Sequence, residues 1–331
     1  GRIAQNLGIP VYSAVDDILN KYDKNFLHRV PESKISKKVF LNLPLIKKKE
    51  YLKKSHKMIK LRFSGAKKYF LDHYKKVSPF LEENVKKKKN SRVINKSRKV
   101  KILIAAHCFF DSPHIYGKMF FSDFHEWIDH LGKLSLKTDY EWYIKTHRNF
   151  FPETLNVLKD FCKKYKKLKL ISSDISHKKI ISEGIDIALT CYGTIGWEYP
   201  FLNVPVLLAS SNHPYQSYDF NIKPKNLKEY DEILKNLDKK FINKQKKKIK
   251  KNQILEYYYM NYLYGRKSWL LRDFEKEKYF KYLQILRTGD IAFSNKIYDI
   301  WMKIFTQKRH KEIIGFLNNF FDSNKSSSNF L

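Results

Sequence analysis

The feature that most constrains the fold is an alternation of short apolar runs with segments of helical periodicity between residues 100 and 210. The first apolar run, Val100–Ala106, has the length and composition of a buried strand. Four similar runs follow at 142–144, 168–171, 185–190 and 204–209. Helical segments separate them at 118–133, 153–166, 176–183 and 192–202. Strands that alternate with helices form parallel sheets covered on both faces, so we predict an α/β domain with a Rossmann-like parallel sheet.

The length of 331 residues suggests more than one domain. We divide the chain into three parts by composition. Residues 1–99 are interpreted as the remnant of an N-terminal domain followed by basic helices and a polar linker, and residues 100–225 as the Rossmann-like domain. Residues 226–331 are predicted to be a helical C-terminal extension with a disordered Ser/Asn-rich tail.

The chain is strongly basic, with 66 lysines and arginines against 33 acidic residues and a net charge of +33. Such a charge favours an anionic partner, which leaves nucleic acid, anionic lipid and nucleotide-sugar as candidates. Only ten of the basic residues are arginine, the side chain best suited to base edges and bidentate phosphate contacts. Nucleic acid is therefore the less favoured partner, and an AT-rich genome would give a similar lysine bias.

Three cysteines without a C-x-x-C spacing exclude a disulfide framework and a structural zinc knuckle. A reducing compartment fits this usage. No apolar run approaches the length of about 20 residues that a bilayer span needs. We therefore expect a cytoplasmic location, with peripheral attachment to the inner face of the membrane as a further possibility.

The turn after the fourth predicted strand carries the most informative residues. Gly193 and Thr194 come just before a predicted helix, where free N–H groups and the helix dipole favour an anion. A plain structural role is also open, in which the Thr194 hydroxyl caps the helix by accepting a bond from an N–H near Trp197. Glu198, one turn into the helix, is interpreted as a capping partner, a solvated side chain or a ligand of ribose hydroxyls.

A cation and an imidazole follow the second predicted strand. Lys145, His147 and Arg148 come at its carboxyl end, where they would face the same crevice. This composition suits the stabilisation of a diphosphate or a leaving group. The alternative for His147 is an ordinary structural or surface histidine.

Polar residues also follow the first and last predicted strands. His107 and Asp111 come after the first, and we interpret them as a polar wall of a ligand cleft. Their spacing to His114 matches no metal-binding pattern, so no metal is predicted. Asn212 and His213 follow the last strand, where turn formation is the competing explanation. The carboxyl ends of parallel strands share one edge of a sheet, so four such loops predict one ligand site.

Together these motifs resemble the C-terminal nucleotide-binding half of GT-B glycosyltransferases of bacterial surface polysaccharides. The closest likeness is to the capsule polysaccharide biosynthesis group, which includes Kdo transferases, with polysialyltransferases and teichoic-acid glycerophosphotransferases as more distant relatives. Lys145 and His147 match the family's Lys-x-His-Pro element, although Arg148 replaces the proline. Thr194, Gly196 and Glu198 match its turn before a helix. The likeness covers about residues 100–225.

The resemblance implies an inverting glycosyl transfer without an essential metal or other cofactor. The donor would be a nucleotide-sugar and the acceptor a glycan or glycolipid, with an anionic membrane surface as a further partner. The family's catalytic base usually lies in the N-terminal domain, so His107, Asp111 and His147 are expected to serve the cleft and the leaving group. Two alternatives remain: a non-catalytic membrane-associated scaffold on a Rossmann-like platform, and a basic nucleic-acid-binding protein.

Overall fold

The computed structural model describes residues 3–4, 7–15, 18–22, 30–64, 79–81, 92–110, 119–146, 152–264 and 307–323. The chain divides into two compact units. The first combines Gly1–Phe26 with Tyr264–Leu331, and the second is Leu27–Leu263. These boundaries differ from the predicted divisions near residues 100 and 225, because helices from both flanking regions pack on the sheet.

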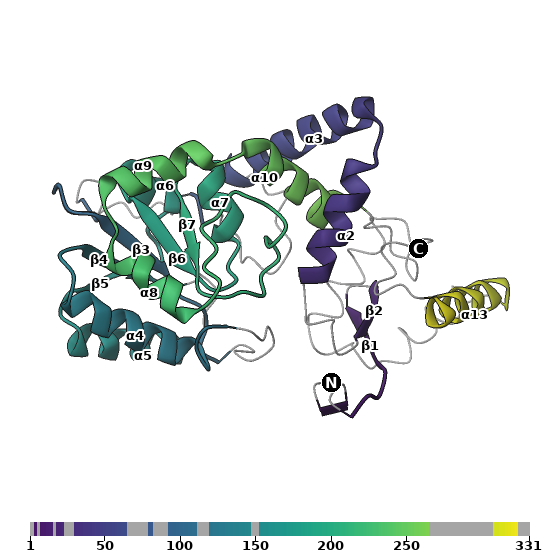
Figure 1. The fold of residues 1–331 in the computed structure, drawn as a ribbon, viewed down its shortest axis with the longest axis horizontal. Coiled ribbons are helices and arrows are strands. Elements are labelled where there is room, and N and C mark those ends of the chain that lie inside the picture. Colours follow the sequence, from purple (N-terminus) through teal and green to yellow (C-terminus); the bar gives the residue numbers. More distant parts are fainter. Residues whose placement is uncertain are drawn as a thin grey trace. The chain divides into compact units, whose positions relative to one another are not determined.

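The second unit is built on a five-stranded, fully parallel sheet in the order β5-β4-β3-β6-β7 (Figure 1). The strands are β3 (Lys101–Ala105), β4 (Glu141–Lys145), β5 (Leu168–Ile171), β6 (Ile187–Thr190) and β7 (Val206–Leu208). Each strand overlaps the apolar run from which it was predicted. The α/β fold class with a Rossmann-like parallel sheet is thereby confirmed.

Helices cover both faces of this sheet, as its apolar strands require. On one face, Ile102, Ile104 and Ile144 pack against α4 (Phe124–Leu136), α5 (Pro152–Lys164), α8 (Leu227–Lys235) and Ile242 of α9 (Lys239–Lys248). On the other face, Leu103 and Val206 pack against α3 (Leu45–Ser64), α6 (His177–Ser182), α7 (Ile195–Phe201) and α10 (Lys251–Tyr258). Alternate residues of one strand thus belong to two separate cores.

The helix α4 begins later than the predicted residue 118 because two side-chain hydrogen bonds fix its start. The Asp123 side chain accepts a hydrogen bond from the Glu126 N–H at 2.8 Å, and the Glu126 carboxylate accepts one from the Ser122 N–H at 2.6 Å. These two bonds satisfy N–H groups that have no partner within the helix.

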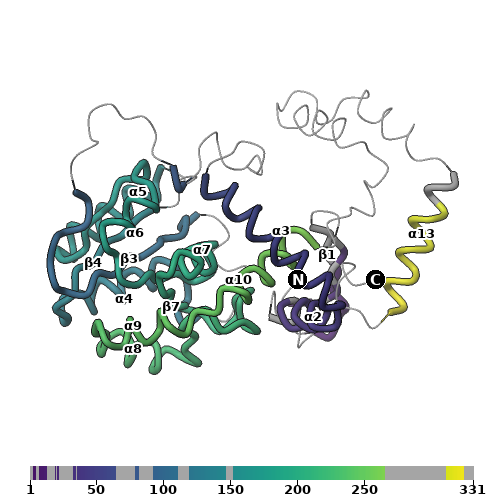
Figure 2. Tube along the Cα trace, turned by 90° about the horizontal axis from the view of Figure 1, so that it is seen from above, coloured from purple at the N-terminus to yellow at the C-terminus, as the bar shows by residue number. Residues whose placement is uncertain are grey.

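Segments from both sides of the sheet domain join the second face. The basic helix α3 lies beside α10 and carries Ile59 and Phe63 into the core (Figure 2). The helix α2 (Val30–Leu41) contacts α10, which continues into the π-helix η2 (Tyr259–Leu263). A basic helix from residues 1–99 and the helices of residues 227–263 therefore belong to the sheet-containing unit.

The first unit contains a hairpin of β1 (Val11–Val15) and β2 (Ile18–Tyr22), together with α13 (Gln307–Asp322). The Tyr12 ring meets the rings of Phe320 and Phe321 edge-on, with centroids 6.3 and 4.9 Å apart. The tail predicted to be disordered lies, beyond Ser323, outside the described residues. Nowhere in the described ranges is a helix long and apolar enough to cross a bilayer.

Candidate functional site at the switch point of the sheet

The strand order places a topological switch point between β3 and β6. From β3 the chain proceeds to β4 and β5 on one side, and then crosses to β6 and β7 on the other. Open parallel sheets bind ligands in the crevice outside the carboxyl ends of the strands at such a point. Here His107 follows β3, and the turn at residues 190–194 follows β6.

His107 holds the turn after β6 across this point. Its Nε2 accepts a hydrogen bond from the backbone N–H of Tyr192 at 3.2 Å. That nitrogen therefore carries no proton, and the Thr190 hydroxyl, 3.2 Å away, donates to it. The imidazole stacks on Phe124, with ring centroids 4.4 Å apart. The sequence-predicted residue His107 is thus fixed in orientation by its neighbours.

Glycine is needed at one position of this turn and at one position at the start of α7. A Cβ on Gly193 would lie 2.8 Å from Thr190 Oγ1, which already accepts the Gly193 N–H at 3.1 Å. A Cβ on Gly196 would lie 2.3 Å from the ring of Tyr215. The Tyr215 hydroxyl donates to the Gly193 carbonyl oxygen at 3.0 Å, so the loop after β7 clamps the turn after β6.

Thr194 and Glu198 contact each other. Thr194 occupies the N-cap position of α7, but its hydroxyl donates to Glu198 Oε2 at 3.0 Å and makes no capping bond, so the alternative in which this hydroxyl caps the helix is wrong. Glu198 is buried, which also overturns the solvated alternative for this residue. Its other oxygen, Oε1, accepts from Arg62 Nε at 2.9 Å and from Nη2 at 2.6 Å. Both carboxylate oxygens therefore have protein partners.

Arg62 is a site residue that the sequence analysis missed. It lies near the end of α3, and its guanidinium is 5.4 Å from the centroid of the Trp197 ring. Arginine forms bidentate and stacked contacts that lysine does not reproduce. The sequence does single out this residue, because Arg62 is the only arginine in a helix with seven lysines.

Lys145 lies on the other side of β3 from the turn. Its Nζ donates to the carbonyl oxygens of Ser172 and Ser173, at 3.1 and 2.7 Å, just after β5. The ammonium is thus directed toward β5, away from β6, and the side chain is buried. Three further predicted residues, Asp111, His147 and Arg148, lie outside the described residues.

Asn212 and His213 belong to the loop that carries Tyr215. The Asn212 N–H donates to Ser210 Oγ at 3.0 Å, and His213 Nδ1 accepts the Tyr215 N–H at 3.1 Å. Burial lowers the pKa of His213 to about 3, and the nearby positive charge of Lys223 acts in the same direction. The imidazole is therefore neutral at physiological pH, and its bond to the backbone shapes the loop.

Only part of the switch-point turn and its surroundings is accessible to solvent. Thr190–Tyr192 and Ile195–Pro200 are buried, whereas His107, Gly193 and Thr194 remain partly exposed. A bound ligand would therefore meet an imidazole, a side-chain-free backbone and a hydroxyl. The Arg62 guanidinium is 14% exposed, and its positive charge is balanced by the Glu198 carboxylate.

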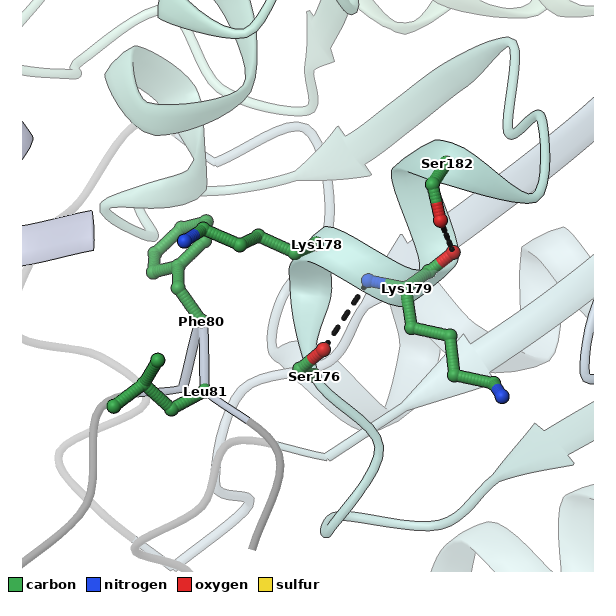
Figure 3. Close-up of a pocket in the computed structure, with 6 residues that line it drawn as sticks. All are labelled: Phe80, Leu81, Ser176, Lys178, Lys179 and Ser182. Carbon is green, nitrogen blue, oxygen red and sulfur yellow. Dashed lines mark hydrogen bonds between the residues drawn. The ribbon is translucent and has the colours of Figure 1, made fainter. Parts of the chain in front are cut away.

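A separate hollow of about 430 Å³ lies beside α6 (Figure 3). Its lining residues are Phe80, Leu81, Ser176, Lys178, Lys179 and Ser182. None of them belongs to the switch-point turn. The part of the chain that the structure describes contains no group of three His, Cys, Asp or Glu side chains able to hold a metal ion.

No family model and no curated protein sequence matches this chain. Several solved structures are similar to it. They include KpsC of Thermosulfurimonas dismutans, a beta Kdo 2,4 transferase, at 14% identity and a TM-score of 0.44, covering 78% of this chain and 74% of KpsC.

This chain aligns with two further solved structures over about half of their length. The MnaA–UDP structure from S. aureus is 16% identical with a TM-score of 0.33, covering 56% of this chain and 52% of MnaA. The wall teichoic acid polymerase TagF is 17% identical with a TM-score of 0.29, covering 60% of this chain and 45% of TagF.

Proposed function

We propose that this chain belongs to a glycosyltransferase that uses a nucleotide-activated sugar to build a bacterial surface polysaccharide. One observation carries the proposal. His107 is hydrogen-bonded to the Thr190–Thr194 turn across the switch point of the parallel sheet, and these residues supply the polar groups that are accessible there. The resemblance of the turn to that of GT-B glycosyltransferases supports the same assignment.

The proposed reaction moves a sugar from a nucleotide donor to an acceptor hydroxyl. The bond between the anomeric carbon and the donor phosphate breaks, a bond to the acceptor oxygen forms with inversion, and the acceptor proton passes to a base. The resemblance implies that no metal is essential. Positive groups then assist departure of the nucleotide. From the resemblance, His147 is assigned to the leaving group.

The decisive experiment is a thermal-shift screen of the full chain with CMP, CDP, UDP and GDP. A nucleotide in large excess over its dissociation constant stabilises the folded state, by about 2.7 kcal/mol at a hundredfold excess. Thr194→Val replaces the hydroxyl by a methyl group on a side chain of similar shape and should abolish the shift. Lys178→Gln in the hollow beside α6 is the matched control and should leave the shift unchanged.

Two outcomes would contradict the proposal. If no nucleotide raises the melting temperature, the scaffold alternative is favoured. If Lys178→Gln abolishes the shift and Thr194→Val does not, the nucleotide binds beside α6. His147→Ala tests the leaving-group assignment, since it should lower turnover more than donor affinity.

A further inference from the structure

The helix α3 has two chemically opposite faces. Ser55, Ile59 and Phe63 are buried at i, i+4 and i+8. Four exposed lysines, at i, i+4, i+8 and i+11, lie in a row on the exposed side of the helix and form what we call the lysine stripe. They are Lys49, Lys53, Lys57 and Lys60. At about 1.5 Å per residue the stripe is roughly 16 Å long.

An exposed apolar corner lies at one end of this stripe. Leu45 and Ile46 begin α3 and are 67% and 82% exposed, and Leu41 at the end of α2 is 58% exposed. Lys48 Nζ donates to the Leu41 carbonyl oxygen at 2.6 Å, which links the two helices at this corner. The ribbon shows α2 and α3 meeting there (Figure 1).

The concentration of apolar side chains at this corner is unusual for the unit. In the described part of residues 27–263, six large hydrophobic side chains are exposed, and three of them are Leu41, Leu45 and Ile46. Ile46 is three residues before Lys49 and seven before Lys53, so it lies on the side of the helix that carries the stripe.

We propose that this face of α3 docks the protein on an anionic lipid bilayer. The apolar corner would enter the headgroup region, and the lysine stripe would lie against the anionic headgroups. Amphipathic helices with lysines beside exposed apolar residues bind membranes by this combination of burial and charge. A nucleic-acid partner would explain the lysines but not the three exposed aliphatic side chains. The inference goes beyond the proposed function and does not depend on it.

The helix α9 provides a matched control within the same chain. It contains six lysines, of which Lys240, Lys244, Lys247 and Lys248 are exposed. Its apolar residues Phe241 and Ile242 are not exposed. The two helices therefore carry similar charge, but only α3 has an apolar corner.

The test is co-sedimentation of the full chain with vesicles of phosphatidylcholine containing about one quarter phosphatidylglycerol, and with vesicles of phosphatidylcholine alone. We expect binding to the mixed vesicles only. Replacing the four stripe lysines by glutamine should weaken partitioning about 600-fold, since each lysine near such a surface contributes about fivefold. The same replacement of the four exposed α9 lysines should weaken it less than about fivefold.

Insertion of the corner can be observed directly. Ile46→Trp places an indole at a highly exposed position that bears no packing, so the fold should be retained. The chain has five tryptophans of its own, so the emission of the new indole is obtained by subtracting that of the parent protein. This emission should shift to the blue on mixed vesicles, and Leu45→Ser with Ile46→Ser should weaken partitioning at least tenfold.

Three results would overturn the proposal. Equal losses in the α3 and α9 variants would indicate generic basicity, and an unshifted indole emission from the Ile46→Trp protein would show that the corner stays in water. Duplex DNA that displaces the protein from vesicles through the same stripe lysines would indicate a nucleic-acid surface instead. The nucleotide thermal shift should be unchanged in the stripe variants, so failure here is distinguishable from failure of the proposed function.

Discussion

Arg62 and Glu198 form a buried ion pair, in which Nη2 of Arg62 lies 2.6 Å from Oε1 of Glu198. The two side chains are 14% and 2% exposed. The pair joins α3, which precedes the sheet in the chain, to α7, which follows the switch-point turn. Because the second oxygen of Glu198 accepts from Thr194, the turn is positioned in part by a helix outside the predicted Rossmann-like segment.

Loss of Arg62 should destabilise the protein. Arg62→Met leaves the Glu198 carboxylate buried without its cation, and breaking a buried pair from one side costs about 3–5 kcal/mol. Urea denaturation should show this loss, and the double variant Arg62→Met with Glu198→Leu should recover most of it. A change below about 0.5 kcal/mol for the single variant would show that the pair is not formed in solution.

Gly196→Ala should destabilise the protein by about 1–3 kcal/mol, the usual range for overpacking. The added methyl would lie 2.3 Å from the Tyr215 ring, which is buried and held by its bond to Gly193. The control is Gly315→Ala in α13, where a Cβ meets nothing within 4 Å and alanine has the higher helix propensity. Thermal melts of both variants test this prediction. Equal melting temperatures would show that the position of Gly196 is not in close contact with the Tyr215 ring.

Glu256 should make the folded state less stable at neutral pH than in mild acid. Burial raises the pKa of this α10 carboxyl from 4.5 to about 7, against the opposing effect of Lys37 and Lys48. Between pH 4.5 and about pH 7, Glu256 keeps its proton in the folded state and has lost it in the unfolded state. Unfolding therefore releases a proton, and the free energy of unfolding contributed by this group falls as the pH rises through this window.

Glu256→Gln removes this dependence. The variant should exceed the parent protein in stability by about 2 kcal/mol above the window, and the gain should vanish near pH 4.5. Urea denaturation at several pH values measures the difference, with Glu153→Gln at the exposed start of α5 as the control. A gain that is independent of pH would mean that ionisation of Glu256 is not its cause.

His213 should remain neutral across the physiological range. Its folded pKa of about 3 lies below the ordinary value of 6.5, so its ring proton signals should not move between about pH 5 and pH 8. Two-dimensional NMR of the histidine side chains tests this, with the urea-unfolded chain as the reference. A shift near pH 6.5 in the folded protein would show that the ring is accessible and that the loop after β7 is open.

The sheet was predictable because its signal is local. Buried parallel strands are covered on both faces, so the sequences of β3 and β6 are nearly continuous apolar runs. Such runs can be recognised in the sequence alone. The polar residues after each strand were also found in this way, since a residue's place after a strand follows from chain order alone. His107 and the Gly193–Thr194 turn are positions of this kind.

The partners of those residues were not predictable from spacing. Arg62 pairs with Glu198 across 136 residues, and Tyr215 clamps a turn 22 residues earlier. Lys145, at the expected strand end, is directed to carbonyl groups beside β5 rather than toward the turn.

The sequence by itself determined the five strands of the parallel sheet and the helices between them, which residues follow the strands, and that the chain is strongly basic. Only the tertiary structure decided which polar groups satisfy one another and which remain accessible at the switch point. The physical reason is that apolar periodicity is a property of neighbouring residues, whereas hydrogen bonds and ion pairs depend on the three-dimensional order of strands and helices. That order, β5-β4-β3-β6-β7 with α3 packed on one face, brings Arg62, Thr194 and Glu198 together.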